Sequence, residues 1–476
     1  MYKRLSIMWA FLALAGLISF FGCGGDDNGG GPAPVPADLD SAYQELAGLM
    51  GEMIDTISSG NEMHPEDYDF TSLHGVFRNY EQTHPGDPKS SFGAALTSLL
   101  TLSTSEDLNA LLDTIIAMGD GGFPKLQGIP NPTKMSSRRE FFTFPTELPA
   151  AGVERNFMAQ SYVALMARAI SNPPKFSEIQ QMIRDDFMPA VDNASRYMDK
   201  VLDDPDFVFW VTPEMMGETS DSIEIDRADF LVFAAGLRVI KSFFHLAVAY
   251  DVDIPSYDLA GIAFIFDQSN NWMSLHLDGE TQMTSARTDF LDAIGFADGA
   301  ISALQNEPFS DPNQSNDLIV VNWYPSDYQE AHSILDSIQA YLTTTQTVYA
   351  DFDGDGGTEM VSVDMSSLFD NPIDGIFSLL PPYTSEIGAV QDTIWYYWWY
   401  WDGYEYREDS AISYIDEFYA VMITWDADTF NDWAFPNPSI NGLFPDVNSD
   451  VEFKSLFGLT PDMWQKQMQL DLDFDF

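Results

Sequence analysis

The spacing of apolar residues changes once along the chain, and this change limits the folds that the sequence can adopt. Over about 40–345, apolar residues recur every three or four positions, as Ala42, Leu46, Leu49 and Met53 do, which is the period of one face of an α-helix. After that, short apolar runs alternate with aromatic and turn residues, a pattern typical of strands and loops. We therefore expect a mainly α body followed by a smaller, irregular β-containing region over 346–476.

Amphipathic segments within the body predict the individual helices. A polar residue that can cap a helix opens the last of them, since Ser326 stands before Asp327. Two short runs rich in apolar and β-branched residues, 207–212 and 222–226, predict strands that form a hairpin between helices. The predicted helices are Val153–Ile170, Ser177–Leu202, Ala228–Tyr250, Ser285–Asn306 and Ser326–Thr343.

A segment between residues 71 and 102 carries bulky, proline and small residues at a recognisable spacing. They are Leu73, Phe77, Tyr80, Pro85 and the run Phe92-Gly93-Ala94-Ala95. The segment resembles the junction between two tetratricopeptide repeats (TPR), where such residues close one helical hairpin and a small residue opens the next. The resemblance implies a TPR-like, helical-hairpin body over 40–345, and it says little about the ligand.

The charge balance of the chain is strongly acidic. There are 74 Asp and Glu against 21 Lys and Arg, a net charge of −53, and loss of Lys3 and Arg4 with a cleaved signal would make it −55. Such a surface repels phosphate groups and anionic lipid headgroups, so we expect no nucleic-acid partner. Cations are the natural partners, while the alternative is a solvated acidic coat that keeps an exported protein soluble.

Residues 1–23 have the order of an export signal. Two basic residues precede a 17-residue apolar stretch, and Gly22 and Cys23 follow it. The stretch Phe20-Phe21-Gly22-Cys23 resembles the bacterial lipobox, which implies a lipoprotein signal peptide over 1–22 and a lipid anchor on Cys23. Cys23 is the only cysteine, so it has no disulfide partner within the chain. The alternative is an uncleaved membrane helix at the short limit for a span.

A tether of residues 23–39 follows the signal. It is rich in glycine and then in proline, a composition that gives a flexible and then a stiff linker. In lipoproteins of this class, Asp directly after the lipidated cysteine retains the protein at the inner membrane, and here that position is Gly24. The resemblance therefore implies an outer-membrane lipoprotein of the bacterial cell envelope, with its periplasmic or surface face left open.

The sharpest local motif is the acidic run from residue 351 to residue 359. Oxygen-bearing side chains at alternate positions, with a glycine at the sixth, let a short loop wrap a hard cation. The run resembles the calcium loops of EF-hand-like, dockerin and thrombospondin-type proteins, but Ser362 stands where an EF-hand has its bidentate Glu, so we expect a strand–loop–strand site with structural calcium. The alternative is an acidic turn that binds nothing. The expected ligands are Asp351, Asp353, Asp355 and Glu359 through side chains and Gly357 through its carbonyl.

An aromatic run from Ile394 to Tyr406 surrounds the dipeptide Asp402-Gly403, a strong hairpin signal. Rings that alternate along a strand line both of its faces, so exposed rings would stack on sugars or pack on a protein or envelope surface. The alternative is a hairpin that is buried on both faces. The candidate ligand-stacking residues are Trp395, Trp398, Trp399 and Trp401.

Met468–Phe476 alternate strictly between apolar and acidic or polar residues, which predicts an edge or sheet-closing strand. The six histidines show no paired metal spacing, and the sequence carries no serine-nucleophile, phosphate-loop or dinucleotide signature. We therefore expect a non-enzymatic, membrane-anchored envelope or surface lipoprotein that acts as a scaffold or binding module for a protein or glycan. The alternative is a carbohydrate-active hydrolase or glycan-binding lipoprotein, because the two carboxylates of glycoside hydrolysis have no fixed spacing in sequence.

Overall fold

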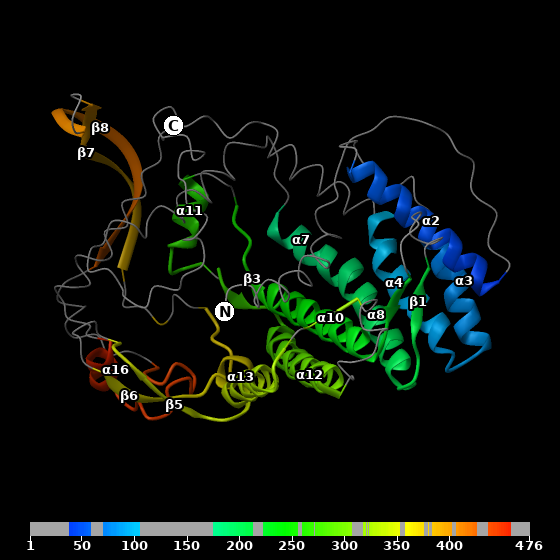
Figure 1. Ribbon diagram of the computed structural model, residues 1–476. Helices are drawn as coiled ribbons and strands as arrows, with labels where there is room; N and C mark the ends of the chain where they lie inside the picture. Colours follow the sequence, from blue (N-terminus) through cyan, green and yellow to red (C-terminus); the bar gives the residue numbers. More distant parts are fainter. Residues whose placement is uncertain are drawn as a thin grey trace.

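The computed structural model describes most of the helical body and part of the C-terminal region. In the described residues the chain is mainly helical, with four small antiparallel sheets of two strands each, so the predicted mainly α class is confirmed. Figure 1 shows the helices following one another from α2 to α13, with the strands β5 to β8 beyond them. The described residues are 38–58, 70–104, 175–212, 222–255, 259–270, 272–306, 318–319, 321, 323–352, 358–375, 379, 383–401, 406–425 and 437–457.

The first helices are α2 (Leu39–Ser58), α3 (Phe70–Thr83) and α4 (Pro88–Leu100), and a single 3-10 turn, η2 (Thr101–Thr104), ends α4. Asp87 caps α4 by accepting a hydrogen bond from the backbone N–H of Ser90. Gly86 precedes it with a φ of 87°, a left-handed conformation that suits glycine in a tight turn. The segment that resembles a repeat junction thus forms two helices, α3 and α4, that pack on each other.

Gly93 is the small residue that lets α3 and α4 approach each other. A Cβ atom added at this position would lie 2.4 Å from two ring atoms of Phe77, closer than packed carbon atoms approach. Phe77 is fully buried in the main core, so its ring cannot swing into solvent. Gly93 is one of the residues on which the resemblance to a repeat junction depends, and its steric role is to leave room for the Phe77 ring.

The predicted helix over 177–202 forms as three joined segments, α7 (Phe176–Met182), the π-helical turn η4 (Ile183–Phe187) and α8 (Met188–Leu202). In η4 the N–H of Met188 donates to the carbonyl of Ile183, five residues back. Pro189 follows directly, and it has neither the N–H nor the room that an α-helical bond to the carbonyl of Asp185 needs. The proline therefore gives a local reason for the wider π turn.

The next helices are α10 (Arg227–Ala247), α12 (Gly279–Asn306) and α13 (Pro325–Thr343). α12 begins at Gly279, ahead of the predicted start at Ser285. The prediction missed this start because the first turn is polar and shows no helical spacing of apolar residues. The N-cap predicted at Ser326 was wrong. Pro325 occupies the first turn, where no N–H is needed, and Tyr324 precedes the helix with its N–H bonded at 3.0 Å to the carboxylate of Asp327.

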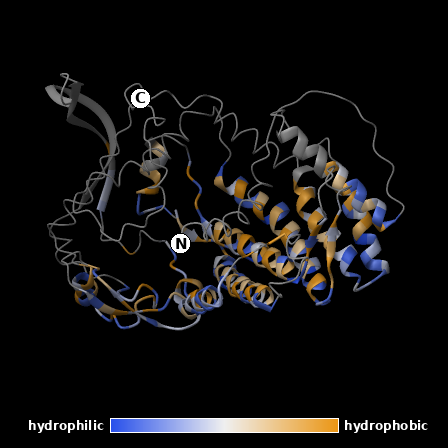
Figure 2. Cartoon of the chain, in the orientation of Figure 1, coloured by the Kyte–Doolittle hydropathy of each residue, from blue (hydrophilic) through white to orange (hydrophobic). Residues whose placement is uncertain are grey.

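The described helices pack chiefly on their neighbours in chain order, α3 on α4, α4 on α8, α8 on α10, α10 on α12 and α12 on α13. The main core lies where the first of them meet, around Phe70, Phe77, Met198 and Phe230. Figure 2 shows apolar residues concentrated along the central helices. α10 is long and apolar enough to cross a membrane by length and composition alone, yet it packs between α8 and α12 as a core helix does.

The strands form antiparallel pairs. The hairpin predicted over 207–226 is present as β1 and β2, and the strands predicted beside the acidic loop are present as β5 and β6. Short helices and turns complete the described part, α11 (Leu259–Ile265), α14 (Ser367–Asp370) and α16 (Asp450–Leu456). The strands are β1 (Phe209–Val211), β2 (Ile223–Ile225), β3 (Tyr250–Asp251), β4 (Ser274–Leu275), β5 (Gln346–Ala350), β6 (Glu359–Val363), β7 (Tyr383–Trp401) and β8 (Tyr406–Trp425).

Several predicted features lie outside the described residues. They are the signal, the tether with Cys23 as far as residue 37, the helix predicted over 153–170 and the strand predicted over 468–476, whereas Leu39 at the end of the predicted tether already belongs to α2. The change in secondary structure that marks the predicted boundary near 345 falls between the end of α13 and the start of β5. Beyond that point Phe369 of α14 joins a buried cluster with Met283 and Ala286 of α12, so this part of the C-terminal region packs on the helical body.

Candidate functional site

The predicted calcium loop joins β5 to β6. Ala350 pairs with Glu359 at the end of the ladder, so both flanks are strands and the geometry is strand–loop–strand. The carboxylate of Glu359 accepts a hydrogen bond of 3.0 Å from the N–H of Phe352, which draws the two ends of the loop together. Asp351 and Glu359 stand at these ends, while the other expected ligands, Asp353, Asp355 and Gly357, lie outside the described residues.

The aromatic run occupies the far end of the β7–β8 hairpin. Figure 1 shows this hairpin as a long two-stranded ribbon beyond the helices. A register shift between Tyr396 and Trp398 sets one residue of β7 against two of β8, which is a β-bulge. Near the tip three successive aromatic residues of β7 are paired with charged residues of β8, and the last pair of the ladder is Trp401 with Tyr406. The register pairs are Trp398 with Asp409, Trp399 with Glu408 and Tyr400 with Arg407.

This register bears on the two interpretations of the aromatic run. Cross-strand partners share a face of the sheet, and successive pairs lie on opposite faces. Trp398 with Asp409 on one face and Trp399 with Glu408 on the other therefore place a carboxylate beside an aromatic position on both faces. The register therefore distributes both residue types over both faces of the ladder.

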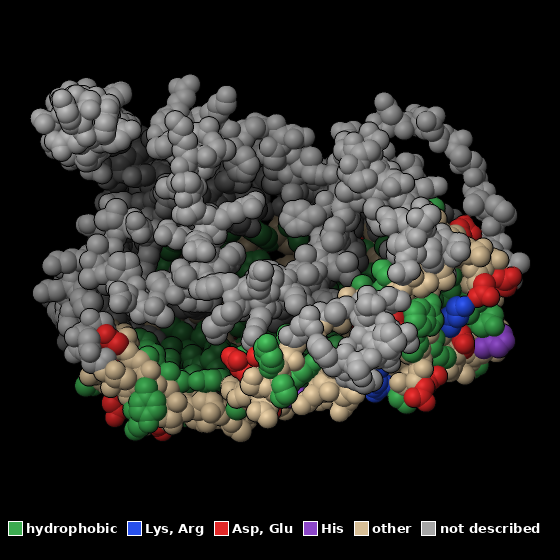
Figure 3. All heavy atoms as spheres, in the orientation of Figure 1, with side chains coloured by type: hydrophobic (Ala, Val, Ile, Leu, Met, Phe, Trp, Pro, Cys, Tyr) green, Lys and Arg blue, Asp and Glu red, His purple; other side chains and the backbone are tan. Residues whose placement is uncertain are grey.

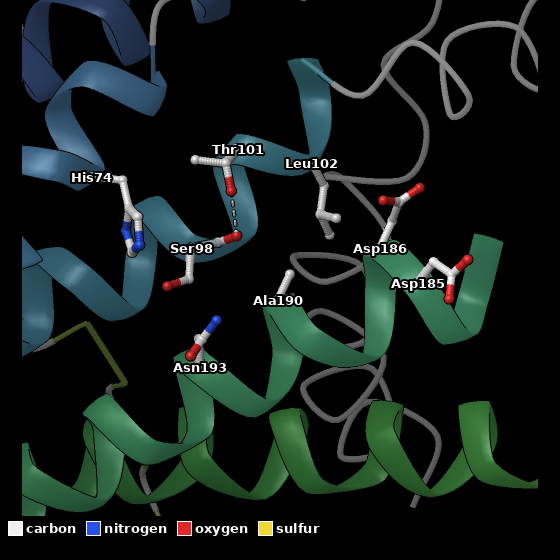
Figure 4. Close-up of a pocket in the computed structure, with 8 residues that line it drawn as sticks. All are labelled: His74, Ser98, Thr101, Leu102, Asp185, Asp186, Ala190 and Asn193. Atoms are coloured by element: carbon white, nitrogen blue, oxygen red, sulfur yellow. Dashed lines mark hydrogen bonds between the residues drawn. The ribbon is translucent and has the colours of Figure 1, made fainter. Parts of the chain in front are cut away.

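A cavity of about 250 Å³ lies between α4 with η2 and the η4–α8 segment (Figure 4), and α3 contributes one of its walls. Its lining is mainly polar, and residues far apart in sequence supply it. The π turn η4 contributes two adjacent carboxylates, a consequence of the wide turn ahead of Pro189. The lining residues are His74, Ser98, Thr101, Leu102, Asp185, Asp186, Ala190 and Asn193.

His74 is the titratable ring of the cavity. Burial, and then the positive charge of Arg78, lower the pKa of His74 below its ordinary value, while the carbonyl of Ala94 opposes them in part. The ring lies with Nδ1 3.0 Å from the hydroxyl of Thr97. A lowered pKa means that the neutral ring is the form that prevails at neutral pH.

A second cluster of ionisable groups fills the seam between α8, α10 and α12. Asp289 of α12 is buried, and three bases from one face of α10 surround it, Arg238 at 3.6 Å, Lys241 at 3.5 Å and His245 at 3.3 Å. Arg238 also pairs with Asp199 at 2.9 Å and Lys241 with Asp192 at 2.8 Å, both from α8. The network is closed within the helices, so we assign it to holding α8, α10 and α12 together.

The scarce basic residues connect separate elements in other parts of the described chain as well. Figure 3 shows acidic side chains at several places on the described surface and few basic ones. Several of the described lysines and arginines lie beside a carboxylate of another helix or loop, and these basic residues connect separate elements of an acidic protein. The pairs are Lys89 with Asp40, Lys200 with Glu81, Arg184 with Asp278 and Arg287 with Asp370.

Sequence reasoning did not identify the cavity. His74, Ser98, Asp186 and Asn193 belong to four different helical segments, and no spacing in the sequence connects them. The pair Asp185-Asp186 just before Met188-Pro189 is the one local signal, because proline there favours a π turn. Within the part of the chain that the structure describes, His, Cys, Asp and Glu form no group of three placed to hold a metal ion.

Comparison of the chain with the models of known protein families, with curated proteins and with solved structures found no match. The candidate sites therefore depend on the geometry and chemistry given above.

Proposed function

We propose that this protein is a bacterial envelope lipoprotein, anchored through lipid on Cys23, whose helical body is a non-enzymatic scaffold or binding module. The observation that carries the scaffold assignment is the packing of the helices in chain order. An array in which each helix contacts chiefly its neighbours exposes long surfaces on both sides, as helical repeat proteins do. The α3–α4 hairpin, closed by Phe77 over Gly93, supports a TPR-like character for this body.

The anchor follows from the sequence around Cys23. A lipidated cysteine would hold the chain at the outer membrane, and the tether of 23–39 would keep the acidic body away from anionic headgroups. Labelling of growing cells with radioactive palmitate tests this proposal directly. We expect label on the wild-type chain and none on Cys23→Ala, and equal labelling of the two chains would contradict the anchor.

The scaffold proposal is tested against hydrolysis. The purified chain is incubated with a panel of polysaccharides, and the release of reducing sugar is measured. We expect no release above the buffer blank. Turnover that disappears when a single carboxylate is changed to its amide would contradict the scaffold proposal and establish a hydrolase.

The register of the β7–β8 hairpin favours a second candidate, a glycan-binding module. Aromatic positions next to carboxylate positions suit sugars, whose apolar faces stack on rings while their hydroxyls donate hydrogen bonds. Binding to a polysaccharide array tests this candidate with Trp399→Ala, and Trp210→Ala is the matched control because Trp210 is 42% exposed on β1. We expect Trp399→Ala to lose binding and Trp210→Ala to keep it, and equal binding by both would remove the hairpin from consideration.

A further inference from the structure

We propose that an exposed face of α13 is a docking surface for a basic, amphipathic helix of a partner protein. The surface, which we call the α13 face, consists of Ile334, Ile338 and Tyr341, which are 52%, 45% and 40% exposed. The inference rests on the scaffold function proposed above, and it names the kind of partner that this scaffold binds.

The three residues of the α13 face lie on one stripe of the helix. They stand four and then three positions apart, and such positions fall on the same side of an α-helix because one turn takes 3.6 residues. A different side of α13 meets α12, through the side chains of Tyr328, His332 and Leu342. At about 100° per residue, the α13 face points about a third of a turn away from that contact.

α13 is the last long helix of the described series that packs in chain order, and it lies next to α12 in Figure 1. The two long helices before it, α10 and α12, bury eight and seven residues, whereas none of the residues of α13 is buried. The element at the end of a helical array requires a polar outer face when nothing packs on it. Isoleucine and tyrosine at outer positions of α13 therefore indicate that a further helix packs there.

Exposed apolar side chains are concentrated in the part of the chain that contains α13. Among the described residues, seven of the twelve large apolar residues that are exposed lie within 318–360. Tyr349 and Met360 belong to this group, and because they are register partners on β5 and β6, they share one face of that hairpin. Single exposed apolar residues are ordinary on a soluble protein, but a group of them marks an interaction surface.

The charge around the α13 face decides which helix fits it. The sequence has no lysine or arginine between Arg287 and Arg407, and on α13 the exposed Glu330 stands one turn before Ile334 on the same side. Acidic surroundings repel an acidic partner, so a second copy of this chain, with a net charge of −53, is disfavoured as the occupant. The complementary occupant is a helix with an apolar stripe and with lysine or arginine along its flanks.

Fluorescence anisotropy of a labelled synthetic peptide tests the proposal. The probe is a helix of about five turns with leucine along one side and lysine on the flanks. It is titrated with the chain from Gly24 onward, which lacks Cys23 and needs no detergent, at about 150 mM salt to screen distant charges. We expect saturable binding to the wild-type chain.

Ile338→Ala should weaken this binding about tenfold or more, because a few large apolar side chains at the centre of an interface carry most of its affinity. Alanine is the best helix former, so α13 should keep its fold, which circular dichroism checks. Ile387→Ala is the matched control: Ile387 on β7 is 45% exposed, as Ile338 is, and it lies in the same stretch without basic residues. Its binding should stay within about twofold of wild type.

Four results would overturn the proposal. Equal affinity of Ile338→Ala and Ile387→Ala for the peptide would remove the α13 face as the site. Equal binding of a scrambled peptide of the same composition would mean that net charge alone attracts it. Absence of binding would mean that no basic helix docks there. A dimer of the wild-type chain in sedimentation velocity that Ile338→Ala converts to a monomer would make a second copy the occupant.

These results are separate from those that test the proposed function. Loss of peptide binding would leave palmitate labelling and the absence of sugar release unchanged, so the anchor and the non-enzymatic assignment would stand. Conversely, hydrolysis of a polysaccharide would contradict the scaffold function, whatever the affinity of the α13 face for the peptide.

Discussion

Substitution of Gly93 by alanine tests the packing of the α3–α4 hairpin. The new methyl group would lie 2.4, 2.4 and 2.8 Å from three ring atoms of the buried Phe77. Overpacking of this kind costs about 3 kcal/mol when the neighbour cannot move. Alanine in place of glycine inside a helix returns about 1 kcal/mol through its higher helix propensity. We therefore expect Gly93→Ala to lower the free energy of unfolding by about 2 kcal/mol.

Gly295→Ala in α12 is the matched control, because a Cβ at that exposed position meets no atom within 4 Å. It should gain about 1 kcal/mol, so the two variants should differ by about 3 kcal/mol. Urea unfolding of the full mature chain, followed by circular dichroism at 222 nm, measures both. If Gly93→Ala proves as stable as Gly295→Ala, the close approach of α4 to the Phe77 ring is wrong.

Three further predictions concern charged groups. Calcium should bind the chelator-treated chain with measurable heat and raise its melting temperature, and Asp353→Ala or Asp355→Ala should abolish both effects; unchanged heat in the variants would remove the assigned loop. The hydrogen bond from Arg184 lowers the pKa of Asp278 to about 2. Between this value and the unfolded pKa of about 4, the folded state binds fewer protons than the unfolded state. The stabilisation from this pair should therefore be complete above about pH 4 and should be lost as the pH falls toward about 2. Asp278→Asn should remove this part of the acid dependence of unfolding, and an unaltered pH profile would contradict the pairing. Asp289→Asn should lower the free energy of unfolding by about 3 kcal/mol, because it leaves Arg238, Lys241 and His245 of α10 without their shared buried carboxylate. A loss below about 1 kcal/mol would show that water reaches these groups.

These ion pairs matter for stability because basic residues are few in this chain. In an acidic chain most carboxylates repel one another, and each lysine or arginine lowers that repulsion where it lies. Arg184 donates to both carboxylate oxygens of Asp278 and also to the carbonyl of Val248, so one side chain connects η4 with the residue that follows α10 and the residue that precedes α12. Salt should weaken such exposed pairs more than the buried seam around Asp289.

The sequence by itself determined the local features of this protein. The helical period located the segments that form α7 to α8, α10, α12 and α13, and short runs of apolar and β-branched residues located β1, β2, β5 and β6. The spacing of apolar residues predicts these elements because each of them turns one face toward the core, and that face is encoded within the element itself. It failed at the start of α12 and α13, where a polar first turn and a proline set the boundary instead of apolar spacing.

Only the tertiary structure decided what these elements form together. The cavity between α4 and the η4–α8 segment draws His74, Ser98, Asp186 and Asn193 from segments that are distant in sequence. The role of Gly93 likewise depends on a ring sixteen residues away that crosses to it in the hairpin. Such features follow from the packing of helices on one another, which no local period encodes, whereas the proposed lipidation motif at Cys23 consists of adjacent residues and needs no tertiary structure to be recognised in the sequence.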